Sequence, residues 1–184
     1  MFLKFKFYQV NNMNNTNNIK TIDITIIPGT TLMHKNTHVL EKIIYENFVH
    51  LANNRELSHT IDNIHKLFNS TSSFFLSASI DGALIGYILG EYINLRHMNN
   101  ADGRTVCYIS YIYVASNYRG KSIATNMMKI LLSDESNDTI NGWMLVFDTH
   151  KKHLAQFYSK FGFKPDILYK KYSQHEVHFK QKFV

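Results

Sequence analysis

The chain has 184 residues, of which 45% are hydrophobic and one is cysteine, and its formal net charge is +6. This length suits one domain with its own core, and the hydrophobic content excludes a chain that is disordered throughout. The single Cys107 excludes an internal disulfide and fits a reducing compartment, while the scattered basic residues favour anionic ligands over a dedicated nucleic-acid surface.

The first twenty residues are predicted to form a short arm and a linker. Residues 11–18 read NNMNNTNN, and Asn is a poor former of both helices and strands. The start of the chain lacks a signal-peptide cleavage site, and no run approaches the roughly 20 apolar residues of a membrane span. We therefore expect a soluble, cytoplasmic protein with its domain at residues 21–184.

The domain is predicted to open with a strand and two helices. Ile alternates with polar residues over 21–28, and a period of two is typical of a half-buried strand. Apolar residues then recur at helical spacing over 38–51 and again over 58–68. We expect β, α, α as the opening order.

A β-hairpin is predicted next, because two β-rich runs, 74–80 and 83–93, flank the pair Asp81-Gly82. After a polar loop, strands and helices alternate. The strands are expected at 106–114, 143–148 and 176–183, and the helices begin near Ile123 and Leu154. The complete order predicts a mixed α/β sheet with antiparallel strands first and a strand, helix, strand crossover after them.

The segment 115–122, ASNYRGKS, has two competing interpretations. It nearly matches the nucleotide-binding loop G-x-x-x-x-G-K-[ST], with Ala115 in place of the first Gly. In that interpretation Lys121 reaches the outer phosphates, while Ser122 and Asp148 hold magnesium. The bulky loop interior and the antiparallel hairpin upstream weigh against it, since backbone wraps phosphate best where residues are small.

Two segments resemble the GCN5-related N-acetyltransferase (GNAT) superfamily. Residues 119–124, RGKSIA, follow an apolar strand and resemble its coenzyme A loop, [RQ]-x-x-G-x-[GA]. Residues 154–163, LAQFYSKFGF, resemble its A-x-x-[FL]-Y-x-x-x-G-F helix, and Gly162 is expected to end that helix in a left-handed conformation. The resemblance covers about residues 21–180. It implies a mostly antiparallel central sheet flanked by helices, with a splayed parallel strand pair that forms the acetyl-CoA cleft.

The resemblance implies transfer of an acetyl group from acetyl-CoA to a primary amine by direct attack in a ternary complex, without a metal. It assigns the role of general acid to Tyr158. It assigns cofactor contacts to Ile112, Tyr113, Val114, Arg119, Gly120, Lys121, Ser122, Ile123, Ala124, Thr125 and Lys152. A helix N-terminus with its unpaired amides and partial positive charge suits a pyrophosphate on physical grounds.

Four features leave alternatives open. Ser122 replaces a glycine that is usual in the superfamily, and its hydroxyl can donate to phosphate or cap the helix. Lys152 stands where relatives often have Asn. Tyr158 is either catalytic or a core aromatic, and Glu91, our candidate general base, is either catalytic or a solvated edge carboxylate.

His97 is a poorer candidate for the base than Glu91. His150 and His153 have the spacing of a metal pair, but no third ligand of matching spacing accompanies them, so no metal site is predicted. Two other functions stay open from the sequence: a small P-loop nucleotide phosphotransferase, and a catalytically silent coenzyme A-binding module. The acceptor amine, small molecule or peptide, and homodimer formation are also open.

Overall fold

The computed structural model describes residues 3–10, 19–28, 62–97, 103–133, 139–166 and 175–182. The helix predicted over 38–51 lies outside these residues, as do the first residues of the helix predicted over 58–68. The linker predicted over 11–18 and the last residue of the strand predicted over 176–183 also lie outside them. The other predicted strands and helices fall within the described residues.

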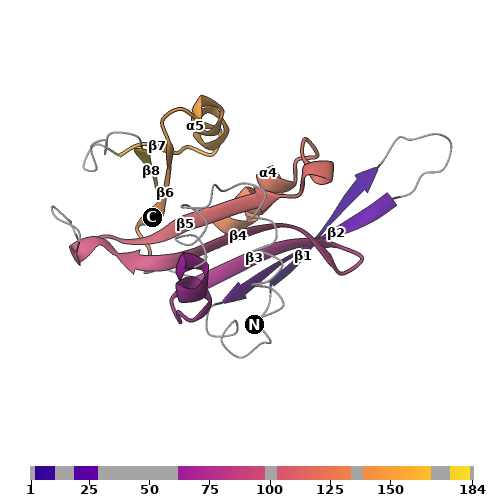
Figure 1. The fold of residues 1–184 in the computed structure, drawn as a ribbon, viewed down its shortest axis with the longest axis horizontal. Helices are drawn as coiled ribbons and strands as arrows, with labels where there is room; N and C mark the ends of the chain where they lie inside the picture. The colour runs from indigo at the N-terminus through magenta and orange to yellow at the C-terminus, as the bar shows by residue number, and fades with distance from the viewer. Residues whose placement is uncertain are drawn as a thin grey trace.

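The described strands form one eight-stranded sheet (Figure 1). Its order is β1 (Leu3–Val10), β2 (Ile19–Pro28), β3 (Ser73–Ile80), β4 (Ala83–Asn94), β5 (Thr105–Val114), β6 (Gly142–Asp148), β8 (His175–Gln181) and β7 (Lys164–Pro165). Each neighbouring pair is antiparallel except β5 and β6, which run parallel. The mixed, mostly antiparallel α/β sheet is therefore confirmed.

Strand β1 is an element that the sequence did not predict. Its residues were expected to form an arm, but they pair with β2 along their whole length, from Leu3 opposite Ile26 to Val10 opposite Ile19. The alternation of apolar and basic residues in LKFKF is the period-two signal that could have found it. The proposed domain boundary at residue 20 stays a prediction.

Helices cover both faces of the sheet. Helix α4 (Ile123–Leu132) packs its apolar face against one cluster of sheet residues, which includes Phe74 and Leu76. The helical residues 62–68 pack against the other cluster, which includes Phe75. Because successive side chains of a strand point to opposite faces, these two clusters lie on opposite sides of β3. None of the described helices is long and apolar enough to cross a membrane.

Strands β5 and β6 are joined at their starts. The amide of Asn141 donates to the carbonyl oxygen of Thr105 at 2.7 Å, and the amide of Thr105 donates to Asn141 Oδ1 at 2.8 Å. Parallel pairing then runs only from Val106 opposite Gly142 to Ile109 opposite Leu145.

Beyond Ile109 the two strands separate (Figure 1). Strand β5 continues to Val114 beside β4, whereas β6 continues to Asp148 beside β8. The edge of β5 from Ser110 onward therefore has no strand partner on the β6 side within the described sheet. This is the splayed parallel pair that the resemblance implied.

A β-bulge lies at the point where β5 leaves β6. The register of β4 and β5 shifts between Leu89, which is opposite Tyr111, and Gly90, which is opposite Ile109, so that Ser110 is the extra residue. A Cβ atom on Gly90 would lie 2.2 Å from the carbonyl oxygen of Tyr108 and 2.8 Å from the Phe74 ring. The chain therefore needs glycine at position 90.

Gly90→Ala is expected to lower the free energy of unfolding by about 2–3 kcal/mol, because the new methyl group overlaps backbone that cannot move independently. Urea denaturation measures this change. Gly86→Ala on the same strand is the matched control, since its Cβ would lie 3.0 Å from the carbonyl oxygen of Tyr113. Equal losses in the two variants would contradict the close approach at Gly90.

Candidate active site

A cavity of about 650 Å³, called the main cavity below, lies between the end of β5, the loop that follows it, the start of α4 and helix α5 (Lys152–Ser159). Its volume falls in the range of ligand-binding pockets, about 300–1,000 Å³. It is lined by Ile112, Tyr113, Val114, Tyr118, Arg119, Gly120, Ser122, Ile123, Ala124, Thr125, His153, Leu154, Phe157 and Tyr158.

The fold thus brings together Tyr158 and all the predicted cofactor residues except Lys121 and Lys152. The ammonium of Lys121 lies over the ring of Tyr118, 5.3 Å from its centroid. Lys152 is exposed at the first residue of α5, and its neighbour His153 lines the main cavity instead.

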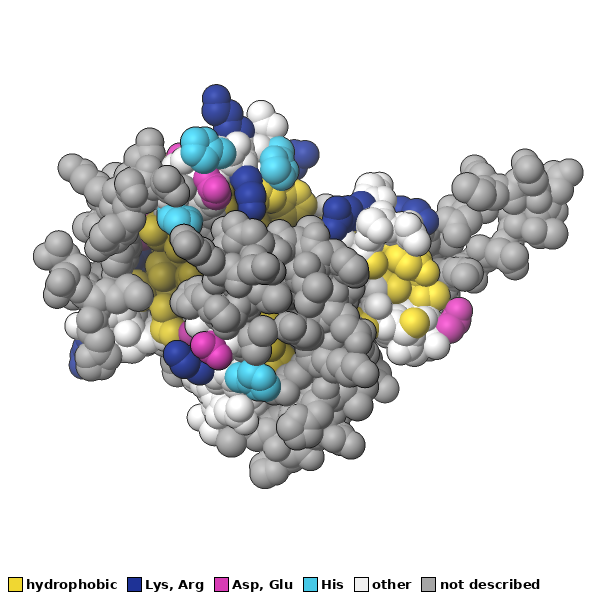
Figure 2. Space-filling model, in the orientation of Figure 1, with side chains coloured by type: hydrophobic (Ala, Val, Ile, Leu, Met, Phe, Trp, Pro, Cys, Tyr) yellow, Lys and Arg dark blue, Asp and Glu magenta, His cyan; other side chains and the backbone are white. Residues whose placement is uncertain are grey.

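The sequence did not single out Tyr118, His153, Leu154 and Phe157 as residues of the site. A signal existed for the last two, because the apolar stripe that predicted the final helix contains both of them together with Tyr158. Lys and His side chains gather over α5 on the face shown in Figure 2. Positive side chains near a cavity favour an anionic ligand.

The loop between β5 and α4 is shaped by local contacts. A short 3₁₀ turn (Ser116–Tyr118) follows the strand, and the amide of Arg119 donates to the carbonyl oxygen of Ser116 at 3.2 Å. Arg119 Nε donates to the carbonyl oxygen of Val114 at 2.9 Å, which holds the guanidinium against the end of β5. Gly120 then adopts a left-handed conformation with φ of 73°.

The start of α4 presents unpaired amides to the main cavity. No backbone carbonyl of the described chain accepts a hydrogen bond from the amides of residues 120–125, whereas the amide of Asn126 donates to the carbonyl oxygen of Ser122 at 2.9 Å. A Cβ on Gly120 would meet nothing within 4 Å, so the space above this residue is open. These amides and the helix dipole fit a pyrophosphate group.

Ser122 lies at the start of α4 but does not act as a capping serine. It occupies the N-cap of α4, but its side chain makes no capping hydrogen bond. Its φ of 59° is left-handed, a conformation that costs a non-glycine residue roughly 1–2 kcal/mol. The capping alternative is therefore wrong, and donation to phosphate stays a prediction.

Ser122→Gly is expected to raise the free energy of unfolding by about 0.5–1 kcal/mol. Relief of the left-handed strain exceeds the backbone entropy that glycine loses on folding, which is about 0.5–1 kcal/mol. Urea denaturation measures the change. Ser116→Gly in the same loop is the control, and an equal gain there would contradict this account of Ser122.

Tyr158 is fixed by the end of α5. The amide of Phe163 donates to the carbonyl oxygen of Tyr158 at 3.4 Å, and the amide of Gly162 donates to that of Ser159 at 2.9 Å. With φ of 85° at Gly162, this is a Schellman motif, and the predicted left-handed end is confirmed. The Tyr158 ring packs against Phe163 and Phe147, at centroid distances of 6.0 and 5.9 Å.

The Tyr158 side chain is therefore both a core aromatic and a wall of the main cavity. Only 5% of the residue is exposed, and this burial raises the pKa of its phenol to about 12. Because the phenolate would have to form away from water, the hydroxyl stays protonated throughout the neutral range. It can act as a hydrogen-bond donor there.

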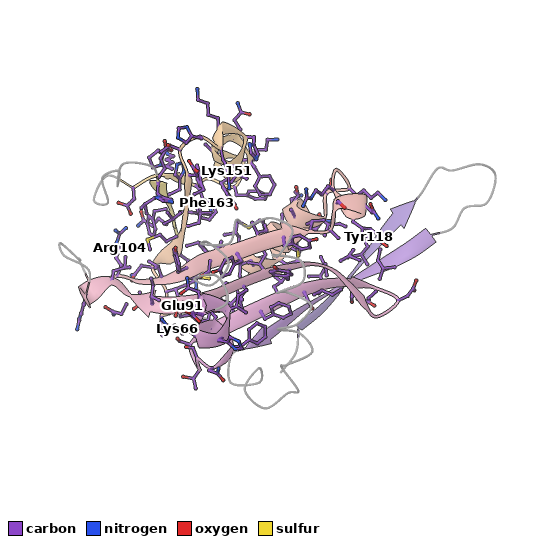
Figure 3. All side chains as sticks on the ribbon, viewed as in Figure 1. Lys66, Glu91, Arg104, Tyr118, Lys151 and Phe163 are labelled. Atoms are coloured by element: carbon purple, nitrogen blue, oxygen red, sulfur yellow. The ribbon has the colours of Figure 1, made fainter. Side chains whose placement is uncertain are left out.

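Glu91 does not line the main cavity. It belongs to a second cavity of about 370 Å³, lined by Asn63, Lys66, Leu67, Glu91, Tyr108, Ser110 and Tyr111. The second cavity lies beside the helical residues 62–68 (Figure 3). Burial raises the pKa of the Glu91 carboxyl above its usual value. His97, the poorer candidate base, ends a short 3₁₀ turn (Leu95–His97).

The two cavities meet at one strand. Ser110 and Tyr111 line the second cavity, and the next two residues, Ile112 and Tyr113, line the main cavity. All four follow Ile109, where pairing with β6 ends. The unpaired edge of β5 therefore borders both cavities.

The nucleotide-loop interpretation does not fit this geometry. Lys121 is absent from the main cavity wall, and Asp148 Oδ1 instead accepts a hydrogen bond from the amide of His150 at 2.9 Å. Only β5 and β6 are parallel among the described strands, whereas folds built from repeated strand, helix, strand units have largely parallel sheets.

Comparison with known proteins gives a family match. Residues 38–163 match the model of the acetyltransferase (GNAT) family. No curated protein matches the chain.

Several solved structures share the fold. The NAA60 protein of Arabidopsis thaliana, solved with a bisubstrate analogue, is 16% identical with a TM-score of 0.58, over 87% of this chain and 99% of that chain. The complex of the same protein with acetyl-CoA is 16% identical with a TM-score of 0.59, and the match covers 87% of this chain and 98% of that chain. The PaiA N-acetyltransferase of Thermoplasma acidophilum, solved with coenzyme A, is 16% identical with a TM-score of 0.59, and the match covers 88% of this chain and 99% of that chain. At these identities the likeness concerns the fold alone.

Proposed function

Since the chain belongs to the acetyltransferase (GNAT) family, we propose that it transfers an acetyl group from acetyl-CoA to a primary amine. The observation that carries this proposal is the main cavity, where unpaired amides at the start of α4 and the Tyr158 side chain line one space. The structural neighbours solved with acetyl-CoA and coenzyme A support the choice of cosubstrate.

Coenzyme A binding is assigned to two parts of the main cavity. The amides of residues 120–125 face the pyrophosphate, and Gly120 leaves room for it. The unpaired edge of β5, Ile112 to Val114, offers backbone groups to the pantetheine arm. Leu154 and Phe157 provide apolar surface on the opposite wall. Arg119 acts through Val114, whose carbonyl it holds, rather than as an unattached charge.

The chemistry needs a neutral amine, a stabilised oxyanion and a stabilised leaving thiolate. The amine nitrogen attacks the thioester carbonyl carbon, the carbon–sulfur bond breaks, and the amine gives up one proton while the thiolate gains one. Donors that are already oriented toward the developing oxyanion lower the barrier most. Backbone amides at the end of β5 are our candidates for this role.

Tyr158 is assigned to the thiolate. The phenol pKa is about 12 and a thiol pKa is near 8.5, so complete proton transfer from tyrosine to thiolate is unfavourable by roughly 5 kcal/mol. We therefore assign the hydroxyl to donating a hydrogen bond to sulfur as negative charge develops, with the final proton arriving from solvent. Its protonated state at neutral pH suits that role.

Glu91 is assigned as the general base. Its carboxyl lines the second cavity rather than the main cavity, so the amine proton reaches it from the β5 edge directly or through water. Because burial raises the pKa of Glu91, the ionised carboxylate is a stronger base than an exposed one.

Amine-dependent release of free coenzyme A thiol from acetyl-CoA tests the proposal. An amine panel should include amino acids, polyamines, lysine derivatives and peptides with free N-termini, and mass spectrometry should identify the acetylated product. Thiol release without added amine is the control for hydrolysis. Coenzyme A binding without acetyl transfer to any amine would instead favour the silent binding module.

A further inference from the structure

Beyond the candidate base Glu91, the second cavity carries charged and polar groups that the acetyl-transfer proposal leaves unused. Its wall contains one carboxylate, Glu91, and one ammonium group, Lys66. The other polar groups are the hydroxyls of Tyr108, Ser110 and Tyr111 and the amide of Asn63. The wall of the main cavity differs, because among the described residues it contains Arg119 and His153 but no carboxylate.

The two charged groups share the second cavity without neutralising each other. Neither Lys66 nor Glu91 forms an ion pair with another residue that the structure describes. Figure 3 labels both on the side of the sheet where residues 62–68 lie. A half-buried carboxylate without a cation partner is costly, and its pKa responds in the expected direction, upward. Lys66 is exposed, so the cost of burial falls on Glu91. A ligand that brings a cation to Glu91 would offset that cost, and an anion on the same ligand would pair with Lys66.

We propose that the second cavity binds the acceptor, and that this acceptor is a small amine carrying a carboxylate, with Glu91 facing its amine and Lys66 facing its carboxylate. The inference rests on the proposed acetyl transfer and adds the class of substrate. Hydroxyls in the wall suit such a zwitterion, because those of Tyr108 and Ser110 can donate to oxygens and accept from nitrogen. The Tyr111 hydroxyl is hydrogen-bonded to the Asn63 side chain.

The route to the thioester follows from the shared edge of β5. Ser110 and Tyr111 line the second cavity, while Ile112 and Tyr113 line the main cavity. No β6 residue pairs with this stretch, so an amine held beside Glu91 lies near the gap through which it reaches the thioester. The bulge at Ser110 places Tyr111 on the side of residues 62–68.

The charges also disfavour other acceptor classes. A diamine or polyamine would bring a second ammonium group toward Lys66, and like charges held close together repel. A simple alkylamine would leave Lys66 without its partner. Without that charge-assisted hydrogen bond, kcat/KM should fall by about tenfold or more.

The test compares matched acceptors under acetyl-CoA saturation. Glycine and β-alanine supply an amine and a carboxylate, glycinamide and ethylamine lack the carboxylate, and putrescine supplies a second amine. For the wild-type protein we expect kcat/KM to be at least about tenfold higher for the amino-carboxylates. Lys66→Glu should lower kcat/KM for them by about tenfold or more and raise it for putrescine.

Lys164→Glu is the control, since it makes the same charge change at an exposed residue of β7 that lines neither cavity. Both variants should keep the wild-type thermal shift with coenzyme A, which shows that folding and the main cavity are intact. Amines acetylated without preference for a carboxylate, or a preference unchanged in Lys66→Glu, would overturn this inference alone. Equal kcat/KM for glycine and for peptide amides without a nearby carboxylate would also overturn it. Absence of any coenzyme A shift would instead overturn the proposed function.

Discussion

Tyr158→Phe is expected to lower kcat by about 100-fold or more, in the range found when one preorganised hydrogen-bond donor to a developing negative charge is removed, while the affinity for coenzyme A stays close to that of the wild type. The phenol hydroxyl is the only group deleted, and the ring packs against Phe147, Phe157 and Phe163 in either variant. Folding stability should therefore change little. Steady-state kinetics and coenzyme A titration measure the two quantities separately.

Tyr118→Phe is the matched control, because Tyr118 also lines the main cavity and loses the same hydroxyl. Its kcat should stay within a few-fold of the wild type. The high phenol pKa of Tyr158, about 12, adds a second expectation: deprotonation of this group should cause no loss of kcat below about pH 11. Wild-type kcat in Tyr158→Phe would remove the proposed role.

Glu91→Gln is expected to lower kcat/KM at pH 8 by about 100-fold, because the base that accepts the amine proton is lost. In the wild type, kcat/KM should fall as pH decreases through the raised pKa of the Glu91 carboxyl, since protonation removes the base. The variant should lack that pH dependence. A pH profile of kcat/KM between pH 4 and 9 measures both effects.

Folding stability distinguishes a catalytic role of Glu91 from a structural role. The pKa of the Glu91 carboxyl is higher in the folded protein than in the unfolded chain. Protonated Glu91 therefore adds to folding stability at pH values below the unfolded-state pKa, and this contribution is lost as pH rises through the folded-state pKa. At neutral pH the ionised carboxylate therefore costs stability, and Glu91→Gln should be at least as stable as the wild type. Asp62→Asn, an exposed residue of the helix over 62–68, is the control for charge. An unchanged pH profile in Glu91→Gln would contradict the assignment.

The parts of the site that the sequence predicted are those fixed by local rules. Gly120 permits the left-handed turn before α4, and Gly162 completes the Schellman motif that fixes Tyr158. Both effects depend on a few adjacent residues, so a short segment of sequence contains them. The hairpin at Asp81-Gly82 was predicted for the same reason.

The parts that could not be predicted depend on contacts between distant segments. The bulge at Ser110 lies where Gly90 approaches Tyr108 closely, and Ser110 and Tyr111 line the second cavity together with Glu91. Strand β1 is different, because its period-two pattern was present in the sequence. Low-complexity residues next to it favoured an arm instead.

The central claim is that the amides at the start of α4 hold the pyrophosphate of coenzyme A, and thermal unfolding with three ligands tests it most directly. At 100 times its Kd a ligand stabilises the folded state by about 2.7 kcal/mol, which is roughly 5–11 °C for a domain of this size. Coenzyme A should raise the unfolding temperature by an amount that keeps increasing with its concentration. Pantetheine should raise it much less, because pantetheine lacks the pyrophosphate, and magnesium-ATP should not raise it. A larger shift with magnesium-ATP, or equal shifts with coenzyme A and pantetheine, would contradict the claim.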